Sequence, residues 1–344
     1  MDLSKLKEIE NVQYCFPSDN TTCPKEKRST EIHAILYIIF LSGILITVCG
    51  NLLVIISISH FKQLHTPTNI LVLSLAVADF VLGLFVMPFS MVRSIETCWY
   101  FGDTFCLFHS NIDMALSTIS VFHLIFIAVD RYFAVCDPLL YTAKITMRVA
   151  WLFVAISWIV GILYICAIIY FKGNTEGLEG FDPCPGDCII VFNAVWGTLD
   201  TMVTFFLPCS VMLCLYAKIL TVAKRHERVI NTIEDQMQPI EERKVKAPRS
   251  KEGKATKTLT IVIGVFVVCW LPFFVNSLID PFLNFSTPPI VVDALQWLGY
   301  FNSGFNPIIY ALFYPWFQKA LNVIVTCKIF SPDSSFINLF PESN

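Results

Sequence analysis

Three acidic side chains lie inside long apolar stretches of this 344-residue chain: Asp79, Asp113 and Asp200. A charged group at the centre of a bilayer costs roughly 2.5–3.5 kcal/mol on insertion scales, so acids in such stretches are candidates for function. The only Lys or Arg in the apolar stretches is Arg131, which lies in the last turn of one of them. Protons, small cations or a cationic ligand must therefore supply the counter-charge.

Asp113 and Asp200 occupy comparable positions in two different stretches. Asp113 lies seven residues after Cys106, and Asp200 lies eight residues before Pro208. With the orientation derived below, both lie at a shallow depth that is reachable from outside. Neighbouring helix axes are about 8–10 Å apart, which would place the two carboxylates on opposite walls of one cavity. Such a cavity suits a cation with one or two charged ends; the alternative for each acid is protonation or hydrogen bonding to nearby hydroxyl groups.

Aromatic side chains fall at compatible depths in two other stretches: Trp270, Phe273, Phe274, Trp297 and Tyr300. An aromatic face attracts an ammonium group by about 0.5–2 kcal/mol. Ordinary packing is the alternative, and the ligand hypothesis depends on the coincidence of these residues with Asp113. Acids near the outer mouth, solvated loop residues if taken singly, would raise the local cation concentration: Asp182, Asp187, Asp280 and Asp293.

Asp79 lies deeper, at the level of a different set of polar residues: Ser120, Asn302, Ser303 and Asn306. Oxygen ligands of this kind suit a hard cation such as sodium. A water-filled hydrogen-bond network is the alternative, and the two can coexist. We expect no other cofactor.

The elements that position these acids are seven apolar runs: Ala34–Ser59, Asn69–Val92, Cys106–Val135, Val149–Tyr170, Ile189–Tyr216, Leu259–Leu278 and Val291–Phe313. Each has about the 20 residues that a bilayer-spanning helix needs. Only 15% of residues are charged, against about 25% in soluble domains. The net charge of −3 gives no signal for a nucleic-acid partner. We predict an all-α membrane protein, a seven-transmembrane helix bundle with a short amphipathic cytoplasmic helix.

Basic residues are unevenly divided between the two sides of the membrane. One set of loops with the C-terminal tail, counting Arg131, holds seventeen Lys and Arg residues, and the other set with the N-terminal tail holds seven. The positive-inside rule places the N-terminus outside, as expected in a plasma membrane. The domains are then an extracellular tail (1–33), the bundle (34–313, with a cytoplasmic loop at about 224–255) and a cytoplasmic tail (314–344) whose helix contacts lipid.

Six of the 13 cysteines fall in segments that this topology places outside: Cys15, Cys23, Cys98, Cys106, Cys184 and Cys188. An even set in an oxidising compartment indicates three disulfides, although six cysteines allow 15 pairings. Asn20 begins a glycosylation acceptor in the outside tail, and Asn284 begins another in an outside loop. Palmitoylation of Cys327, after the amphipathic helix, and a free thiol there both stay open.

Motif residues occur in order, one set in each run: Asn51, Asp79, Asp130-Arg131-Tyr132, Trp158, Pro208, Cys269-Trp270-Leu271-Pro272 and Asn306-Pro307-Ile308-Ile309-Tyr310. From about Tyr37 to Phe330 the chain resembles a rhodopsin-class G-protein-coupled receptor. Three stretches resemble the trace amine-associated receptors more closely: His60–Asn69, Cys98–Gly102 and Asn302–Phe317. Gly304-Phe305 and Gln318 are local departures from the pattern of that family.

The resemblance implies a site. In that family the acid at the position of Asp113 binds the amine, and residues at Trp270 and Tyr300 line the pocket. Asp200 matches the second acid of fish-type members that detect diamines such as cadaverine and putrescine. Catecholamine receptors carry serines in this region, and the chain has none between Asn193 and Pro208, so a catechol ligand is not expected.

The resemblance also implies disulfides and partners. Cys106 would pair with Cys188; Cys23–Cys184 is the favoured second pair, which leaves Cys15–Cys98. Amine binding would shift the population of states so that the sixth span swings outward about Pro272 and Arg131, released from Asp130, receives a G protein. Stimulatory G protein, cAMP, olfactory neurons, arrestin and receptor kinase follow from the same resemblance. The remaining switch positions are Tyr132, Asn306, Pro307 and Tyr310.

Other classes of membrane protein fit the sequence less well. A retinal pump needs a lysine in the last run, which has none, and an enzyme needs more than the intramembrane His109 and His123. An organic-cation transporter or channel is the alternative from a different class, although neither an internal repeat nor polar pore stripes are evident. Within the receptor hypothesis, a diamine bridging Asp113 and Asp200 competes with a monoamine that uses Asp113 alone.

Overall fold

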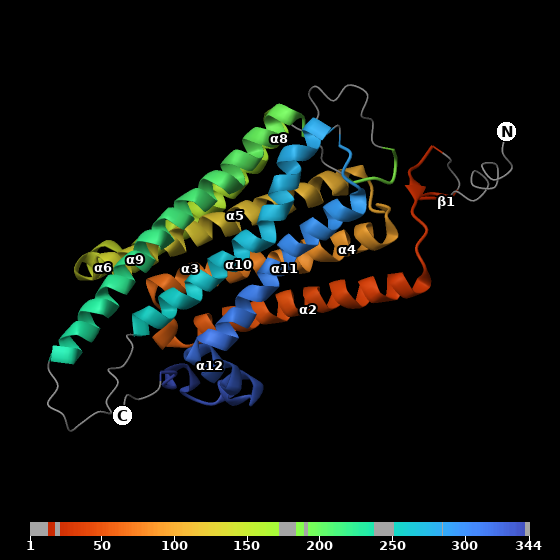
Figure 1. Cartoon of the computed structure of the whole chain (residues 1–344). Coiled ribbons are helices and arrows are strands. Elements are labelled where there is room, and N and C mark those ends of the chain that lie inside the picture. The colour runs from red at the N-terminus through yellow and green to blue at the C-terminus, as the bar shows by residue number, and fades with distance from the viewer. Residues whose placement is uncertain are drawn as a thin grey trace.

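The computed structural model describes residues 13–17, 21–171, 184–188, 192–236, 251–283 and 285–340. Long helices run side by side along most of the chain (Figure 1). The helices are α2 (Thr30–His60), α3 (Pro67–Val81), α4 (Met87–Glu96), α5 (Asp103–Cys136), α6 (Pro138–Lys144), α7 (Met147–Phe171), α8 (Ala194–Thr201), α9 (Leu207–Gln236), α10 (Lys251–Ile279), α11 (Pro289–Phe313) and α12 (Pro315–Val325). Asn20, Asp182 and Asn284 lie outside the described residues, so both predicted glycosylation sites remain predictions.

Shorter elements join or flank these helices. Two strands, β1 (Gln13–Tyr14) and β2 (Pro24–Lys25), form an antiparallel pair in the N-terminal segment. Single turns of 3₁₀ helix are η1 (Lys62–Leu64), η4 (Asp280–Leu283), η5 (Lys328–Phe330) and η6 (Ser334–Phe336). Two π-helical turns, η2 (Leu82–Val86) and η3 (Met202–Phe206), join α3 to α4 and α8 to α9.

Six membrane-length helical segments are apolar enough to cross a bilayer, and α11 supplies a seventh when it is taken with α12, which bends from it by 99°. Large apolar side chains such as Ile38, Leu163 and Leu207 are exposed on the outside of the bundle, where lipid would cover them. The predicted fold class, a seven-helix membrane bundle, is confirmed.

Several helices extend beyond the predicted apolar runs, for example α2 and α10 at their first residues, and two other helix ends bear on the site. The second span continues beyond Val92 to Glu96, and it ends where Thr97 adopts a left-handed conformation (φ 55°). The fifth span begins at Ala194 rather than Ile189, because the Asn193 side chain accepts a hydrogen bond from the Trp196 backbone and caps the helix there. The first correction matters for function, because it brings Arg93 into a helix.

Prolines account for the irregular turns. Pro88 and Pro208 each follow a π-helical turn, as expected because proline has no backbone N–H to continue the α-helical pattern. Pro272 and Pro307 lie inside the continuous helices α10 and α11.

Helix α5 is at the centre of the bundle, in contact with α3, α7, α9 and α10. Within the described residues, the two larger clusters of buried apolar side chains lie in the bundle. The larger includes Leu75, Ile127 and Phe266, and the smaller includes Leu116 and Trp297. Polar residues on α5 are therefore surrounded by other helices, which is the arrangement that a site inside the bundle requires.

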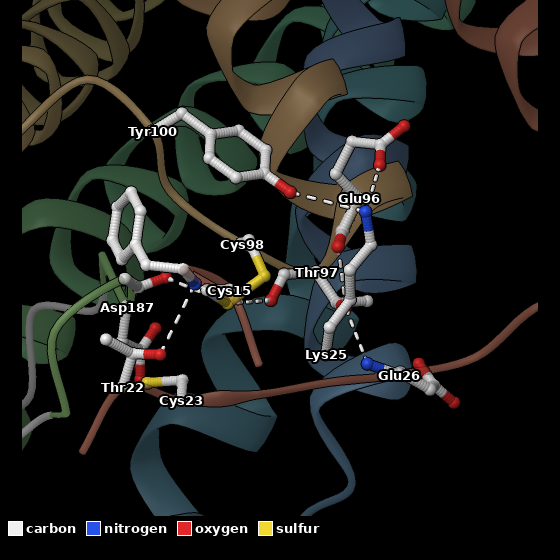
Figure 2. The surroundings of a disulfide bond; sticks show 12 residues. Cys15, Thr22, Cys23, Lys25, Glu26, Glu96, Thr97, Cys98, Tyr100 and Asp187 are labelled. Carbon is white, nitrogen blue, oxygen red and sulfur yellow. Dashed lines mark hydrogen bonds and ion pairs between the residues drawn. A yellow bond between two sulfur atoms is a disulfide. The ribbon is translucent and has the colours of Figure 1, made fainter. Parts of the chain in front are cut away.

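Three disulfides secure the end of the bundle that carries the N-terminal segment: Cys106–Cys188, Cys23–Cys184 and Cys15–Cys98. All three agree with the pairing expected from the family resemblance. Figure 2 shows the N-terminal segment around Cys15 and Cys23, where Lys25 Nζ contacts Glu96 Oε2 at 2.6 Å. This hydrogen bond to Glu96 raises the pKa of Lys25 above its ordinary value. The N-terminal segment is thus fixed to α4 and to the two loops that carry its disulfide partners, Cys98 and Cys184.

Gly299 of α11 lies against the indole ring of Trp270, and a Cβ atom there would lie 2.7 Å from two ring carbons. We expect Gly299→Ala to destabilise the protein by about 1–3 kcal/mol, because the rigid ring or its helix must move. The thermal unfolding midpoint of the detergent-solubilised protein measures this effect.

Gly264→Ala is the matched control, since no heavy atom lies within 4 Å of a Cβ built at Gly264 on the neighbouring helix α10. Its midpoint should equal or slightly exceed that of the wild type, because Ala is favoured over Gly in a helix by roughly 0.5–1 kcal/mol. Equal midpoints for the two variants would contradict the packing argument.

Candidate functional site

A cavity of about 820 Å³ lies at the end of the bundle that carries the N-terminal segment. Asp113 of α5 and Asp200 of α8 both line it, and Trp270, Phe273 and Phe274 of α10 line it as well. The two acids that the sequence placed at similar depth therefore share one cavity. Its size is within the range of small-molecule sites, about 300–1,000 Å³.

The carboxylate of Asp113 is held from α11. Its Oδ2 accepts a hydrogen bond from Tyr300 Oη at 2.5 Å and another from Gln296 Nε2 at 3.1 Å. Gln296 Nε2 also donates to Tyr300 Oη at 2.6 Å, so the three side chains form a closed triangle. Within the described part of the chain, no hydrogen bond reaches Asp113 Oδ1, which leaves that oxygen available to an ammonium group.

Asp200 has a single side-chain partner in the described residues. Tyr164 of α7 donates a short hydrogen bond from Oη to Asp200 Oδ1. Both acids thus have one oxygen held by a tyrosine hydroxyl, and charge-assisted hydrogen bonds of this kind fix a carboxylate in one orientation. Sequence reasoning missed Tyr164, because a tyrosine in an apolar run is indistinguishable from packing until its partner is known.

The aromatic set is only partly as predicted. Trp270, Phe273 and Phe274 form one group, with ring centroids 5.6–5.9 Å apart. Tyr300 is fully buried and acts through its hydrogen bond to Asp113, outside the cavity lining.

The prediction that Trp297 lines the ligand pocket has to be corrected. Its indole N–H donates to Ser94 Oγ at 3.1 Å, its ring stacks on Phe40 at 3.9 Å, and it does not line the cavity. Trp297 therefore packs α11 against α2 and α4. Helical spacing gave its depth correctly but could not give the direction in which the ring points.

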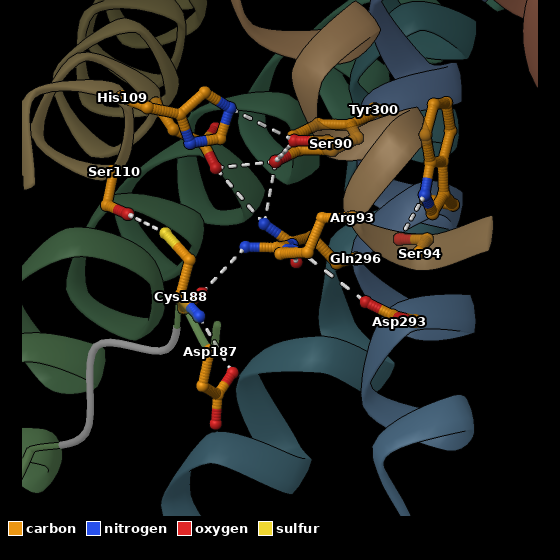
Figure 3. A network of polar contacts seen from close by, with 12 residues as sticks. Ser90, Arg93, Ser94, His109, Ser110, Asp187, Cys188, Asp293, Gln296 and Tyr300 are labelled. Carbon is orange, nitrogen blue, oxygen red and sulfur yellow. Dashed lines mark hydrogen bonds and ion pairs between the residues drawn. The ribbon is translucent and has the colours of Figure 1, made fainter. Parts of the chain in front are cut away.

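Arg93 lines the same cavity and was not expected there. Figure 3 shows its guanidinium group between Gln296, Cys188 and Asp293, with Nη2 at 2.7 Å from Gln296 Oε1 and Nη1 at 3.3 Å from the Cys188 carbonyl. Asp293 Oδ1 lies farther away, at 3.9 Å. The predicted span ends at Val92, which leaves Arg93 in the following loop. Residues 93–96 contain no helix-breaking residue, and the helix continues through them to Glu96.

The N-terminal segment also contributes to the cavity lining through Cys23, Pro24, Glu26 and Arg28. Asp187, next to the Cys106–Cys188 disulfide, lines the cavity too, and burial raises the pKa of its carboxyl group. The mouth of the cavity is therefore built from the N-terminal segment and from residues 184–188, between α7 and α8, as well as from the helices.

The deeper acid, Asp79, is buried in the polar group that the sequence predicted. Ser303 Oγ donates to its Oδ1 at 2.7 Å and Asn306 Nδ2 donates to its Oδ2 at 2.8 Å. Ser120 of α5 lies close enough to interact with this carboxylate, although it forms no hydrogen bond of standard geometry with it in the described residues. The side-chain oxygens of Asn302 and Asn306 are buried without a hydrogen-bond partner in the described residues.

Comparisons with known proteins agree with this geometry. Residues 50–310 match the family described as 7 transmembrane receptor (rhodopsin family). The chain is 55% identical to Trace amine-associated receptor 13c of Danio rerio over 99% of both chains. It is 52% identical to Trace amine-associated receptor 4 of Mus musculus over 96% of both chains. With Trace amine-associated receptor 1 of Homo sapiens it shares 47% identity over 96% of this chain and 98% of the relative.

The chain is a trace amine-associated receptor. It is therefore a G-protein-coupled receptor and not an enzyme. Membership of this family implies an amine ligand and coupling to a G protein.

The end of the bundle opposite the cavity contains a buried ion pair. Arg131 Nη2 lies 2.5 Å from Asp130 Oδ2, and the same carboxylate accepts hydrogen bonds from Thr68 Oγ1 at 2.8 Å and Tyr141 Oη at 3.0 Å. Tyr132, the third residue of this motif, packs partly buried against the core. The inactive-state salt bridge expected between Asp130 and Arg131 is therefore present, with two further partners that the motif alone does not specify.

The other switch positions lie on α10 and α11. Asn306 connects α11 to Asp79. Pro307 packs closely against Gly50 of α2, and a Cβ atom built at Gly50 would lie 2.6 Å from the proline ring. Tyr310 is buried, and its hydroxyl has no hydrogen-bond partner in the described residues. Pro272 lies between Trp270 and Phe273, at the level of the cavity.

We expect Tyr300→Phe to reduce the potency of amine agonists about tenfold. The substitution removes the donor at Asp113 Oδ2, and a hydrogen bond to a charged group contributes about 1.5–3 kcal/mol. An amine dose–response in cells that express the receptor, normalised to surface expression, measures the shift.

Trp297→Phe serves as the control, because it removes a hydrogen bond of similar depth, to Ser94, that does not face the cavity. Its normalised potency should stay near that of the wild type. A loss equal to that of Tyr300→Phe would show that the two residues act only through helix packing.

Proposed function

We propose that this receptor is activated by linear diamines, with one ammonium group at Asp113 and the other at Asp200. The observation that carries the proposal is that both carboxylates line the same cavity. Each is held by a tyrosine hydroxyl, from Tyr300 or Tyr164, and not by a basic residue. Two anionic sites of similar construction suit a ligand with two cationic ends.

A monoamine would satisfy only half of this site. It would pair with Asp113 and leave Asp200 without a counter-charge in a partly buried position, and an uncompensated buried charge is strongly unfavourable. A second ammonium group removes that cost. The aromatic faces of Trp270, Phe273 and Phe274 support the proposal, because they contact either the methylene chain or the ammonium groups favourably.

Signalling follows from a shift between receptor states. Diamine binding to α5 and α8 favours an arrangement in which α10 moves outward about Pro272, Arg131 leaves Asp130, and a G protein of the stimulatory type raises cAMP. In this proposal the receptor lies in the plasma membrane of olfactory neurons, with a glycosylated Asn20 outside. Arrestin and a receptor kinase end the signal.

A sodium ion is proposed as an allosteric ligand at Asp79. The donor set fits a hard cation, since it combines a buried carboxylate with hydroxyl oxygens and with the amide oxygens of Asn302 and Asn306, which lack other partners in the described residues. Asp79 would hold the ion, and Ser120, Asn302 and Ser303 would complete its coordination. Its chemistry is electrostatic: it neutralises a charge buried among the helices.

The diamine proposal predicts unequal effects of Asp200→Asn on two agonists. Cadaverine should lose potency by tenfold or more, because its second ammonium group loses a buried charge partner, which costs about 1.5–3 kcal/mol or more. Pentylamine should change less than threefold, since it has no second ammonium group. A cAMP dose–response with both amines measures the difference, and Asp113→Ala should abolish both responses.

Asp187→Asn is the matched control for a general loss of negative charge. Asp187 lines the same cavity, and an amide oxygen can still accept its hydrogen bond from the Cys188 backbone. Both amines should therefore shift equally in this variant. Equal losses for both amines in Asp200→Asn, or a wild-type preference for pentylamine, would favour the monoamine hypothesis instead.

The sodium proposal predicts that replacing external sodium with potassium raises amine potency severalfold in the wild type. Bound sodium would stabilise the arrangement in which Asp79 of α3 contacts Ser303 and Asn306 of α11. Without the ion, this arrangement competes less well with the state that binds the amine. Asp79→Asn should remove this salt dependence, as measured by amine binding to membranes in matched salts. Ser117→Ala, in the cavity lining on α5, should leave it unchanged. Salt dependence that persists in Asp79→Asn contradicts the proposal.

A further inference from the structure

Arg93 places a permanent positive charge on the helical wall of a cavity that Asp113, Asp200 and Asp293 also line. The other arginine of the lining, Arg28, belongs to the N-terminal segment and pairs with Glu26 at 2.7 Å. The side chain of Arg93 is 18% exposed and that of Asp293 is 28% exposed, so the pair lies partly shielded at the side of the cavity. Arginine remains protonated at any physiological pH. The charge is therefore a fixed property of the site, present with or without a ligand.

The contacts of Arg93 determine which way Gln296 faces. A guanidinium group has only donors, so it takes the amide oxygen, Gln296 Oε1, at 2.7 Å. The amide nitrogen must then face the opposite side, where it donates to Asp113 Oδ2 and to Tyr300 Oη. Arg93 is connected in this way to the primary amine site through one side chain (Figure 3).

Arg93 also neutralises a third acid of the cavity. Asp293 lines the cavity one helical turn before Gln296, and its charge is opposed by Arg93 at 3.9 Å. Without Arg93, Asp293 would offer another carboxylate to the ligand. With Arg93, the same wall repels any additional ammonium group.

We propose that Arg93 limits the number of positive charges on the ligand, so that the receptor accepts diamines and rejects linear triamines. The inference rests on the proposed diamine function and adds a specificity residue to it. Recognition gains selectivity from a repulsive group as well as from attractive ones, and a like charge at a partly desolvated site is costly. Arg93 supplies the repulsive group on the side of the cavity where α4 faces α11.

The test compares cadaverine with the triamine spermidine in three variants, each as the ratio of spermidine to cadaverine EC50. Arg93→Gln removes the charge and keeps a neutral polar side chain, and its ratio should fall by about tenfold or more. Arg93→Lys keeps the charge, and its ratio should stay within about threefold of the wild type. Asp293→Asn leaves Arg93 without its opposing charge, and its ratio should rise.

A double variant identifies the acid responsible for the gain. Arg93→Gln combined with Asp293→Asn should lose the improved response to spermidine, because the carboxylate exposed by the first change is gone. Surface expression, measured through an N-terminal epitope, normalises every response. If Arg93→Gln does not reach the surface, the opposite shift expected in Asp293→Asn alone decides the question.

Two outcomes would overturn the inference. One is an equal shift of both agonists in Arg93→Gln, and the other is an Arg93→Lys ratio that moves together with that of Arg93→Gln. Failure of the diamine proposal is visible separately, as a wild type that prefers pentylamine to cadaverine. In that case the same variants are tested with pentylamine and cadaverine as the two agonists. Loss of the Arg93 charge should then improve the response to cadaverine, which has one more ammonium group than pentylamine.

Discussion

The carboxylate of Asp113 inside an apolar bundle is the constraint on which the half of this receptor around the cavity depends. A charge in such a place is tolerated only when polar groups hold it and a cation can reach it. Tyr300 and Gln296 provide the first condition. The cavity, open between the helices and the N-terminal segment, provides the second.

The surrounding polar contacts extend this constraint outward in layers. Ser90 lies within hydrogen-bond distance of Tyr300 and of His109, both at 3.3 Å, and Arg93 orients Gln296 from the opposite side. The carbonyl of Cys188 contacts Arg93, so the disulfide to Cys106 also connects the loop to this network. A change in the mouth of the cavity can therefore reach the amine site through a continuous set of side chains.

The same physical problem recurs at two other depths with different solutions. Asp79 accepts hydrogen bonds from hydroxyl and amide donors, whereas Asp130 pairs with its neighbour Arg131 and with two hydroxyl groups. The first arrangement suits a small ion. In the proposed mechanism the second arrangement opens, and Arg131 leaves Asp130 for a protein partner. The three acids thus have distinct surroundings along one bundle, which the proposed function assigns to ligand binding, ion binding and signalling.

Residue types and spacing by themselves determined the membrane fold, because apolar runs of about 20 residues can satisfy their backbone in lipid only as helices. They also determined the depth of Asp113, Asp200 and Asp79 along their helices. Tertiary structure decided what each side chain faces. Trp297 points toward Phe40 and Ser94, Arg93 belongs to a helix and to the cavity, and Tyr164 reaches Asp200. Helix rotation and helix ends depend on packing between distant segments, which spacing along one segment cannot specify.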